Sequence, residues 1–562
     1  MKKIFKTAII LICAIFTAGC GILPQETILA ESPDITIRPT PGYTLSPLYT
    51  PSPTQTASPS ASPDAPPQSE EYYIYTLDEG TGEYPYAWTI ECPIKGEIKY
   101  GTYGSDEVRA LQGRLTQLGF YCGGATGSFN NLTLIALNEF QDVVGIERTQ
   151  DLTRETIDVL YSPNGIKAMS IEKSEIPAGI LEGITVFVDA GHGGNATGTA
   201  RGSLVEKTAV LEASYRLKAM LEKAGARVIM TRTDDSAISL TYRSALVNDV
   251  ILSDQYDETE SEIQKLLAKI DAVNSLERID AEGLTGRAQT LLENINNMLK
   301  PLNDAKQYAE AMLDEFGKAS TEYVNAKKCL TELEVKAEEL REEYELIMNA
   351  YYFRQLGVDM DLYEEKYNAR LNELIEYKDK LVYYRELLKV NLDTTNTEYE
   401  GIWEKAYDAN GNKIINPDLK EILDITGEKC NDKYIFISVH INGVDNADYV
   451  NGTEIYVRNI NSSNNNYGVN KYYYSGYNIA QRAKFASSIK TAMDNVIPLE
   501  NGKNSVIKDS DLWVLREINI PCVLVETGYV TNSYDRIKLL NPQTRNAFAY
   551  ALYCGVCDYY LG

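Results

Sequence analysis

The chain has 562 residues and a formal net charge of −26. This length exceeds what one hydrophobic core normally serves, so we expect several domains joined by linkers. The strong negative charge repels polyanions and therefore argues against nucleic acid as a partner. Only two histidines occur, so any chemistry that needs an imidazole must use His192, His440 or both.

Residues 1–20 are typical of an export signal. The run MKKIFKTAIILICAIFTAGC has two lysines, then an apolar stretch too short for a permanent membrane span, then small residues ending at Cys20. The ending TAGC resembles a bacterial lipoprotein processing box. The resemblance implies a lipid on Cys20 and an extracytoplasmic protein anchored in the membrane. A plain cleaved signal peptide is the alternative.

Residues 21–85 are rich in proline, serine and threonine and poor in large aliphatic side chains. Because such a composition cannot bury a core, we expect a disordered, extended tether. The reach of residues 21–80 would be at most roughly 180 Å, at about 3 Å per residue. An anchored protein could then act well away from the membrane surface.

Residues 100–165 form a small helical unit. Apolar side chains recur at helical spacing from Val108 to Leu118, and again from Leu134 to Phe140 after a glycine-rich turn. The run EVRALQGRLTQLGFYCGGATGSFNNLTLIALNEFQDVVGI resembles the three-helix peptidoglycan-binding domain of many wall hydrolases. This resemblance implies that the unit binds peptidoglycan. The alternative is a helical bundle whose residues only pack.

From residue 182 onward, apolar runs of strand length alternate with helical patterns. The runs ITVFVDAG, EKTAVLEASYRLKAMLEKAG and ARVIMTRT predict a β-α-β unit, YIFISVH and PCVLVETG predict further strands, and AFAYALYCGVCDYYL predicts a closing helix. We therefore expect an α/β domain, with a sheet core flanked by helices, in two segments at 182–250 and 433–562. Its site should lie at the carboxyl ends of the strands.

Residues 251–432 interrupt this pattern with highly charged, helix-favouring sequence. Apolar residues at alternating spacings of four and three over 312–351 predict one straight coiled-coil helix of about 60 Å. A turn near Gly357 would send a second helix, through 367–388, back along the first. We expect an antiparallel helical arm, either a plain spacer or a docking or gating element for a protein partner. Deleting 255–428 and assaying wall digestion would distinguish these roles.

Both histidines follow predicted strands of the same sheet, His192 in VDAGHGG and His440 at the end of IFISVH, while Glu206 begins a helix in LVEKT. Two imidazoles and a carboxylate suit a catalytic Zn²⁺ site, which keeps one position for water. Structural roles are the alternative. Lone histidines are usually packed or surface residues, and an acidic residue at a helix N-terminus is favoured by the helix dipole.

Six separated segments carry a family resemblance: VDAGHGG, GSLVEKTAVLEAS, ISLTYRSALVN, YIFISVHIN, NGTEIYV and VLREINIPCVLVETGYVTNSYD. In this order they resemble the zinc-dependent N-acetylmuramoyl-L-alanine amidases of the amidase-3 type. The resemblance implies that His192, Glu206 and His440 hold Zn²⁺ and that Glu526 is the catalytic carboxylate. It implies hydrolysis of the amide between the lactyl group of N-acetylmuramic acid and L-alanine in peptidoglycan.

A few residues depart from this family pattern: Ala190 stands where proline is common, Ile441 where a small residue is common, and Asn504-Ser505 where an Arg-Gly pair often occurs. The last departure leaves the substrate contacts open. Alternatives are a zinc peptidase that cuts within the stem peptide and a non-catalytic scaffold of the cell envelope. Asp189 could orient an imidazole or stabilise a turn.

Overall fold

The computed structural model describes residues 92–161 (except 119, 121, 123 and 124), 176–356, 361–393, 401–403, 406–407, 413–414, 416–428, 433–458, 478–497 and 505–562. The predicted export signal at 1–20, the tether at 21–85 and the turn near Gly357 lie outside the described residues. Within the described ranges, no helix combines the length and the apolar character that a membrane crossing requires.

Three helices form the first described unit: α2 (Asp106–Gln117), α3 (Asn131–Val144) and α4 (Arg154–Leu160). The first two begin at polar caps, because the side chains of Ser105 and Asn130 accept hydrogen bonds from backbone N–H groups of the first turn. Their apolar faces meet in a buried core that includes Leu111, Leu115 and Phe140. The predicted three-helix unit is therefore confirmed.

A six-stranded sheet forms the core of the α/β domain. In the order in which they pair, its strands are β4 (Arg227–Met230), β1 (Thr185–Ala190), β7 (Tyr434–Asn442), β10 (Cys522–Tyr529), β8 (Glu454–Val457) and β9 (Val506–Asp509). Only the pairing of β10 with β8 is antiparallel among these strands. Strands β1, β7 and β10 are almost wholly buried. This burial on both faces explains why their sequences are continuous apolar runs.

Helices cover both faces of this sheet. Successive strand residues point to opposite faces, so Val186 and Val188 pack with α5 (Glu206–Lys223), α11 (Ile479–Val496) and α14 (Pro542–Leu561). Phe187 packs on the other face, with the start of α6 (Leu240–Leu276) and with α12 (Trp513–Arg516). The predicted α/β domain, built from two distant segments, is thus confirmed.

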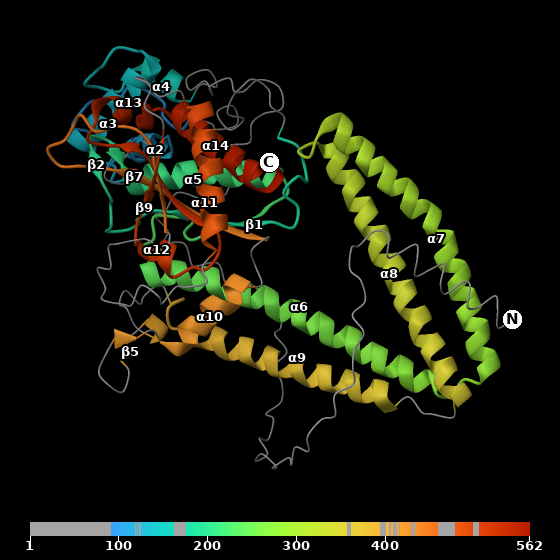
Figure 1. Ribbon diagram of the computed structural model, residues 1–562. Helices are drawn as coiled ribbons and strands as arrows, with labels where there is room; N and C mark the ends of the chain where they lie inside the picture. Colours follow the sequence, from blue (N-terminus) through green and yellow to red (C-terminus); the bar gives the residue numbers. More distant parts are fainter. Residues whose placement is uncertain are drawn as a thin grey trace. The chain divides into compact units, whose positions relative to one another are not determined.

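Four long helices make up the helical arm, and Figure 1 shows them as two side-by-side pairs. They are α6, α7 (Ala281–Phe316), α8 (Thr321–Leu356) and α9 (Asp361–Leu388), with α6 beside α9 and α7 beside α8. Arg370 pairs with Glu262 and Arg385 pairs with Asp249, so residue numbers rise along α9 as those of the facing residues fall along α6. The α6–α9 pair is therefore antiparallel.

The prediction of one straight helix over 312–351 was wrong. The chain breaks at Gly317, whose φ of +79° lies in the left-handed region, and Ser320 begins the next helix by accepting a hydrogen bond from Tyr323 N. The apolar seam continues in register across this turn, so spacing alone could not reveal the break. The segment 367–388 was also expected to return along 312–351, but it lies in α9, against α6.

The remaining short elements link the arm to the sheet or flank the sheet: the β2–β3 hairpin (Ala200–Arg201 and Leu204–Val205), η3 (Gly401–Trp403), β5 (Ala406–Tyr407), β6 (Lys413–Ile414), α10 (Pro417–Glu428) and α13 (Ser533–Leu540). At the base of the arm, Trp403 packs beside Trp513 of α12, with ring centroids 6.4 Å apart. The arm is thereby joined to the domain by a buried contact as well as by the chain itself.

Candidate metal centre and active site

Three polar residues are brought together at the carboxyl ends of β1 and β7. His192 follows β1 in a tight loop with φ of +60°, Glu206 is the first residue of α5, and His440 lies near the end of β7. Gly191 makes this approach possible, because a β-carbon there would lie 2.4 Å from the His440 ring. Positions at strand ends are where ligands bind in open α/β sheets.

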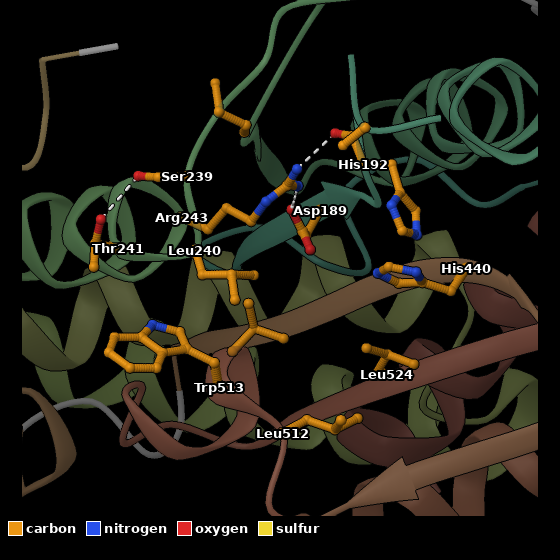
Figure 2. A pocket seen from close by; sticks show the side chains of 13 residues that line it. Asp189, His192, Ser239, Leu240, Thr241, Arg243, His440, Leu512, Trp513 and Leu524 are labelled. Carbon is orange, nitrogen blue, oxygen red and sulfur yellow. Dashed lines mark hydrogen bonds and ion pairs between the residues drawn. The ribbon is translucent and has the colours of Figure 1, made fainter. Parts of the chain in front are cut away.

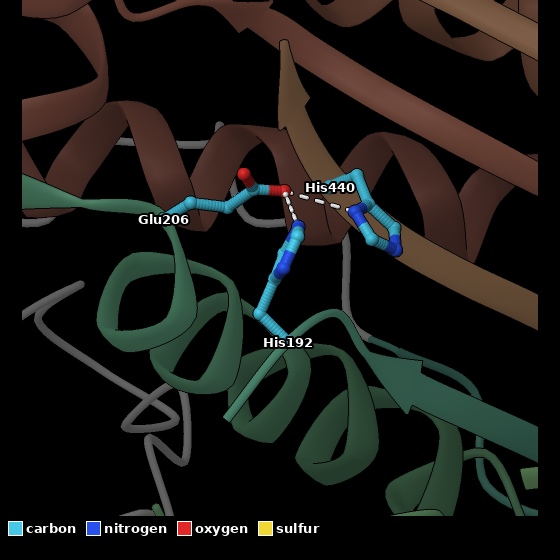
Figure 3. A group of neighbouring side chains, drawn as sticks. All are labelled: His192, Glu206 and His440. Carbon is cyan, nitrogen blue, oxygen red and sulfur yellow. Dashed lines mark hydrogen bonds and ion pairs between the residues drawn. The ribbon is translucent and has the colours of Figure 1, made fainter. Parts of the chain in front are cut away.

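The two imidazoles converge on one carboxylate oxygen, as Figure 3 shows. Glu206 Oε1 lies 3.1 Å from His192 Nε2 and 2.9 Å from His440 Nδ1. One ligand atom from each residue lies within 4.8 Å of the others. Glu206 is 2% exposed, whereas the His192 side chain is 32% exposed. The group can therefore be reached from solvent on the histidine side.

The chemistry of these donors fits a metal ion. Burial by itself would raise the pKa of Glu206, but hydrogen bonds and electrostatic interactions with the two histidines hold that pKa well below its usual range. Thr199 N and Ile441 N fix the carboxylate by donating to its two oxygens, at 2.8 and 3.0 Å. An ionised carboxylate beside two imidazole nitrogens is a donor set that suits Zn²⁺.

Glu526 lies next to this group on β10, directly opposite His440. Neighbouring residues on paired strands point to the same face of a sheet. Burial, together with the negative charges of Glu206 and Glu454, raises the pKa of Glu526 to about 8. Its Oε2 is buried and has no hydrogen-bond partner among the described residues. A carboxyl group in this state is suited to taking up and releasing a proton near neutral pH.

A buried arginine that the sequence analysis did not single out holds the His192 loop. Arg243, on α6, donates to the carbonyl oxygens of Ala190 and His192 at 2.8 and 2.6 Å, and Figure 2 shows it reaching between Asp189 and His192. Asp189 pairs with Arg243 and accepts hydrogen bonds from Thr231 and Ser438. Of the two roles left open for Asp189, these contacts favour stabilisation of the loop.

A cavity of about 450 Å³ opens beside the histidines. Figure 2 shows His192 and His440 on one side of it and apolar side chains on the other, among them Leu240, Leu512 and Trp513. Pockets with apolar walls and a few convergent polar groups are the usual form of a substrate site. The metal-site residues and the cavity together define a candidate hydrolytic centre of an α/β enzyme.

Two known families match parts of this chain. The N-acetylmuramoyl-L-alanine amidase family matches residues 186–254 and 359–558, and a peptidoglycan-binding domain family matches residues 104–160. The first match covers the two segments of the α/β domain and skips part of the arm. The second covers the three-helix unit, which we therefore call the wall-binding unit.

Two curated relatives are named as cell wall amidases. A Bacillus anthracis protein named uncharacterized cell wall amidase is 33% identical over 132 residues, which are 24% of this chain and 22% of that protein. The Staphylococcus aureus protein named probable cell wall amidase LytH is 40% identical over 84 residues, which are 14% of this chain and 28% of that protein. The chain thus matches only about a quarter of the length of these relatives.

Among solved structures, the CwlD amidase of Clostridioides difficile in complex with the GerS lipoprotein aligns over 67% of this chain and 98% of that chain. The sequence identity is 14% and the TM-score is 0.28. The AmiC2 amidase of Nostoc punctiforme gives 16% identity and the same TM-score over 67% of this chain and 97% of that chain.

Proposed function

We propose that this protein is a zinc-dependent N-acetylmuramoyl-L-alanine amidase that removes stem peptides from peptidoglycan. The observation that carries the proposal is the convergence of His192, Glu206 and His440, with Glu526 on the neighbouring strand, inside an amidase domain. The substrate would be the amide between the lactyl group of N-acetylmuramic acid and L-alanine.

In the proposed reaction, His192, Glu206 and His440 would hold the metal ion. Zn²⁺, when bound, would polarise the scissile carbonyl and acidify a water molecule. Glu526 would accept the proton of the attacking water and then deliver it to the leaving amine nitrogen. The buried, unpartnered Oε2 and the raised pKa support this role, because one group must both accept and donate the proton.

Digestion of purified sacculi by the full chain tests this proposal. An amidase frees L-alanine amino termini and leaves the lactyl-muramic acid intact, and mass spectrometry of the fragments would show both products. Cleavage between two amino acids would instead favour a zinc peptidase. Release of no soluble fragment by zinc-loaded protein would favour a non-catalytic scaffold.

The proposed organisation places this activity outside the cytoplasm. A lipid on Cys20 would anchor the chain, residues 21–85 would span the distance to the wall, and the wall-binding unit would hold the substrate polymer. The export-like sequence and the peptidoglycan-binding match support this arrangement. Replacing Cys20 with serine should move the protein from the membrane to the soluble envelope fraction. Retention of the variant in washed membranes would argue against a lipid anchor.

A further inference from the structure

The wall-binding unit contacts the α/β domain at the turn of the β2–β3 hairpin. The carboxylate of Glu139, on α3, accepts hydrogen bonds from the backbone N–H of Ser203 at 2.6 Å and from its hydroxyl group. Its other oxygen accepts a hydrogen bond from Arg536 Nη1 at 3.1 Å. Ser203 is 1% exposed, whereas the Glu139 and Arg536 side chains are 12% and 25% exposed. The bonds to Ser203 are therefore partly shielded from water, and loss of their acceptor would leave the buried Ser203 N–H without a partner.

The two ends of the same hairpin meet at the metal-site carboxylate. Thr199 N donates to Glu206 Oε2 at 2.8 Å, and Glu206 N donates to Thr199 O at 3.0 Å. The Thr199 hydroxyl also donates to Ile441 O at 3.0 Å, next to His440. The segment 199–206 is therefore a closed loop, with the Glu206 carboxylate at its base and Ser203 at its tip.

The tip of the β2–β3 hairpin lies close to α3, and a glycine is found at this contact. Gly202 has φ of +65°, and a β-carbon there would lie 2.2 Å from Glu139 Oε1. The positive φ favours glycine at this position, and any side chain there would displace the Glu139 carboxylate from the tip. From Ser203 at the tip, only Leu204 and Val205 lead to Glu206, and both are buried. Because this connection is short and buried, a displacement of the tip should also move the Glu206 carboxylate.

A second buried contact joins the wall-binding unit to the helix that begins at Glu206. Arg545 is 1% exposed, donates to the carbonyl oxygen of Leu118, and forms an ion pair at 2.7 Å with Glu212 of α5. The apolar cores of the two units are also continuous. The two units therefore pack against each other at these residues, and Glu139 contacts the hairpin that ends at Glu206.

We propose that Glu139 of the wall-binding unit is a positioning residue for the metal centre, acting through the hairpin tip on the Glu206 carboxylate. The proposal rests on the function proposed above and deepens it: the unit that would hold the wall polymer also completes the site that would cut it. Glu139 is not one of the residues that would hold the metal ion. Its effect is exerted by fixing Ser203, which in turn fixes Thr199 and Glu206.

Zinc affinity of the full chain, measured by competition with a chromogenic chelator, tests this role without reference to activity. Glu139→Ala is expected to weaken zinc binding by about 3-fold, less than the roughly 10-fold loss caused by removing a direct partner of a metal ligand, because Glu139 acts through Ser203. Glu139→Gln, which keeps an acceptor for Ser203 N–H, is expected to give a smaller loss. Glu155→Ala, an exposed acidic residue of the same unit, is the matched control and should bind zinc like the unchanged protein.

Equal zinc affinity in the unchanged protein and both Glu139 variants would overturn the proposal, even if the variants melt at lower temperature, because a purely structural contact would lower only stability. If Glu139→Ala does not fold, the comparison of Glu139→Gln with the control decides. Failure of the unchanged protein to bind zinc would instead refute the proposed function. The two failures are therefore distinguishable.

Discussion

Replacing Glu526 with glutamine is expected to lower kcat for wall hydrolysis by about 10²- to 10⁴-fold, the usual contribution of a positioned general acid or base. Glutamine preserves the shape of the side chain but cannot accept the proton of water. Zinc content should not change, because His192, Glu206 and His440 are untouched. The measurement is kcat on sacculi together with zinc stoichiometry. Glu222→Gln, an exposed residue of α5, is the matched control and should retain full activity.

The pH dependence of kcat/KM gives a second readout of the same side chain. Burial and the charges of Glu206 and Glu454 raise the pKa of Glu526 to about 8, and a bound cation would lower it because positive charge favours the carboxylate. As only the carboxylate can accept a proton, kcat/KM should rise with pH up to a pKa below 8. The glutamine variant should lose this rise. An unchanged pH profile in the variant would show that another group is the base.

Much of the site could be predicted because its ligands carry chemistry that few residues supply. The chain has two histidines in 562 residues, and both lie at predicted strand ends. Any metal site with two imidazole ligands from this chain must therefore use both of them. Glu206 was a candidate ligand only in combination with the two histidines, since an acidic residue at a helix start has an ordinary structural explanation. Glu526 depended on the family resemblance. The structure adds what the resemblance could not give, namely that Glu206 Oε1 faces both imidazoles.

The contacts that support the metal-site residues could not be predicted from the sequence. They join residues that are far apart in the chain, and the groups involved form no recognisable sequence motif. Arg243 acts on backbone carbonyl oxygens of the His192 loop, and any residue can present a carbonyl. Glu139 meets Ser203 across two domains. The break at Gly317 was missed for a related reason: helices on both sides of a short turn can continue one heptad pattern, so the pattern alone predicts helix but not helix length.

Exhaustive chelation is expected to abolish wall hydrolysis, and added Zn²⁺ is expected to restore it where Mg²⁺ does not. The predicted donors are two imidazole nitrogens and one carboxylate oxygen, a set that zinc accepts in tetrahedral geometry. Magnesium prefers octahedral oxygen ligands and keeps most of its water. The measurement is product release from sacculi after chelation, dialysis and addition of each metal. Full activity after chelation would refute a metal-dependent mechanism.

His440→Ala separates loss of the metal from other effects of the chelator. Removal of one of three ligands should weaken zinc binding by more than the 10- to 100-fold caused by loss of an outer partner, and excess zinc should not restore kcat. Glu526→Gln is the matched comparison, since it should bind zinc normally yet remain inactive. The two variants therefore differ in zinc content while sharing the loss of activity. Zinc binding by His440→Ala equal to that of the unchanged protein would show that His440 is not a ligand, and the proposed centre would then lack its third donor.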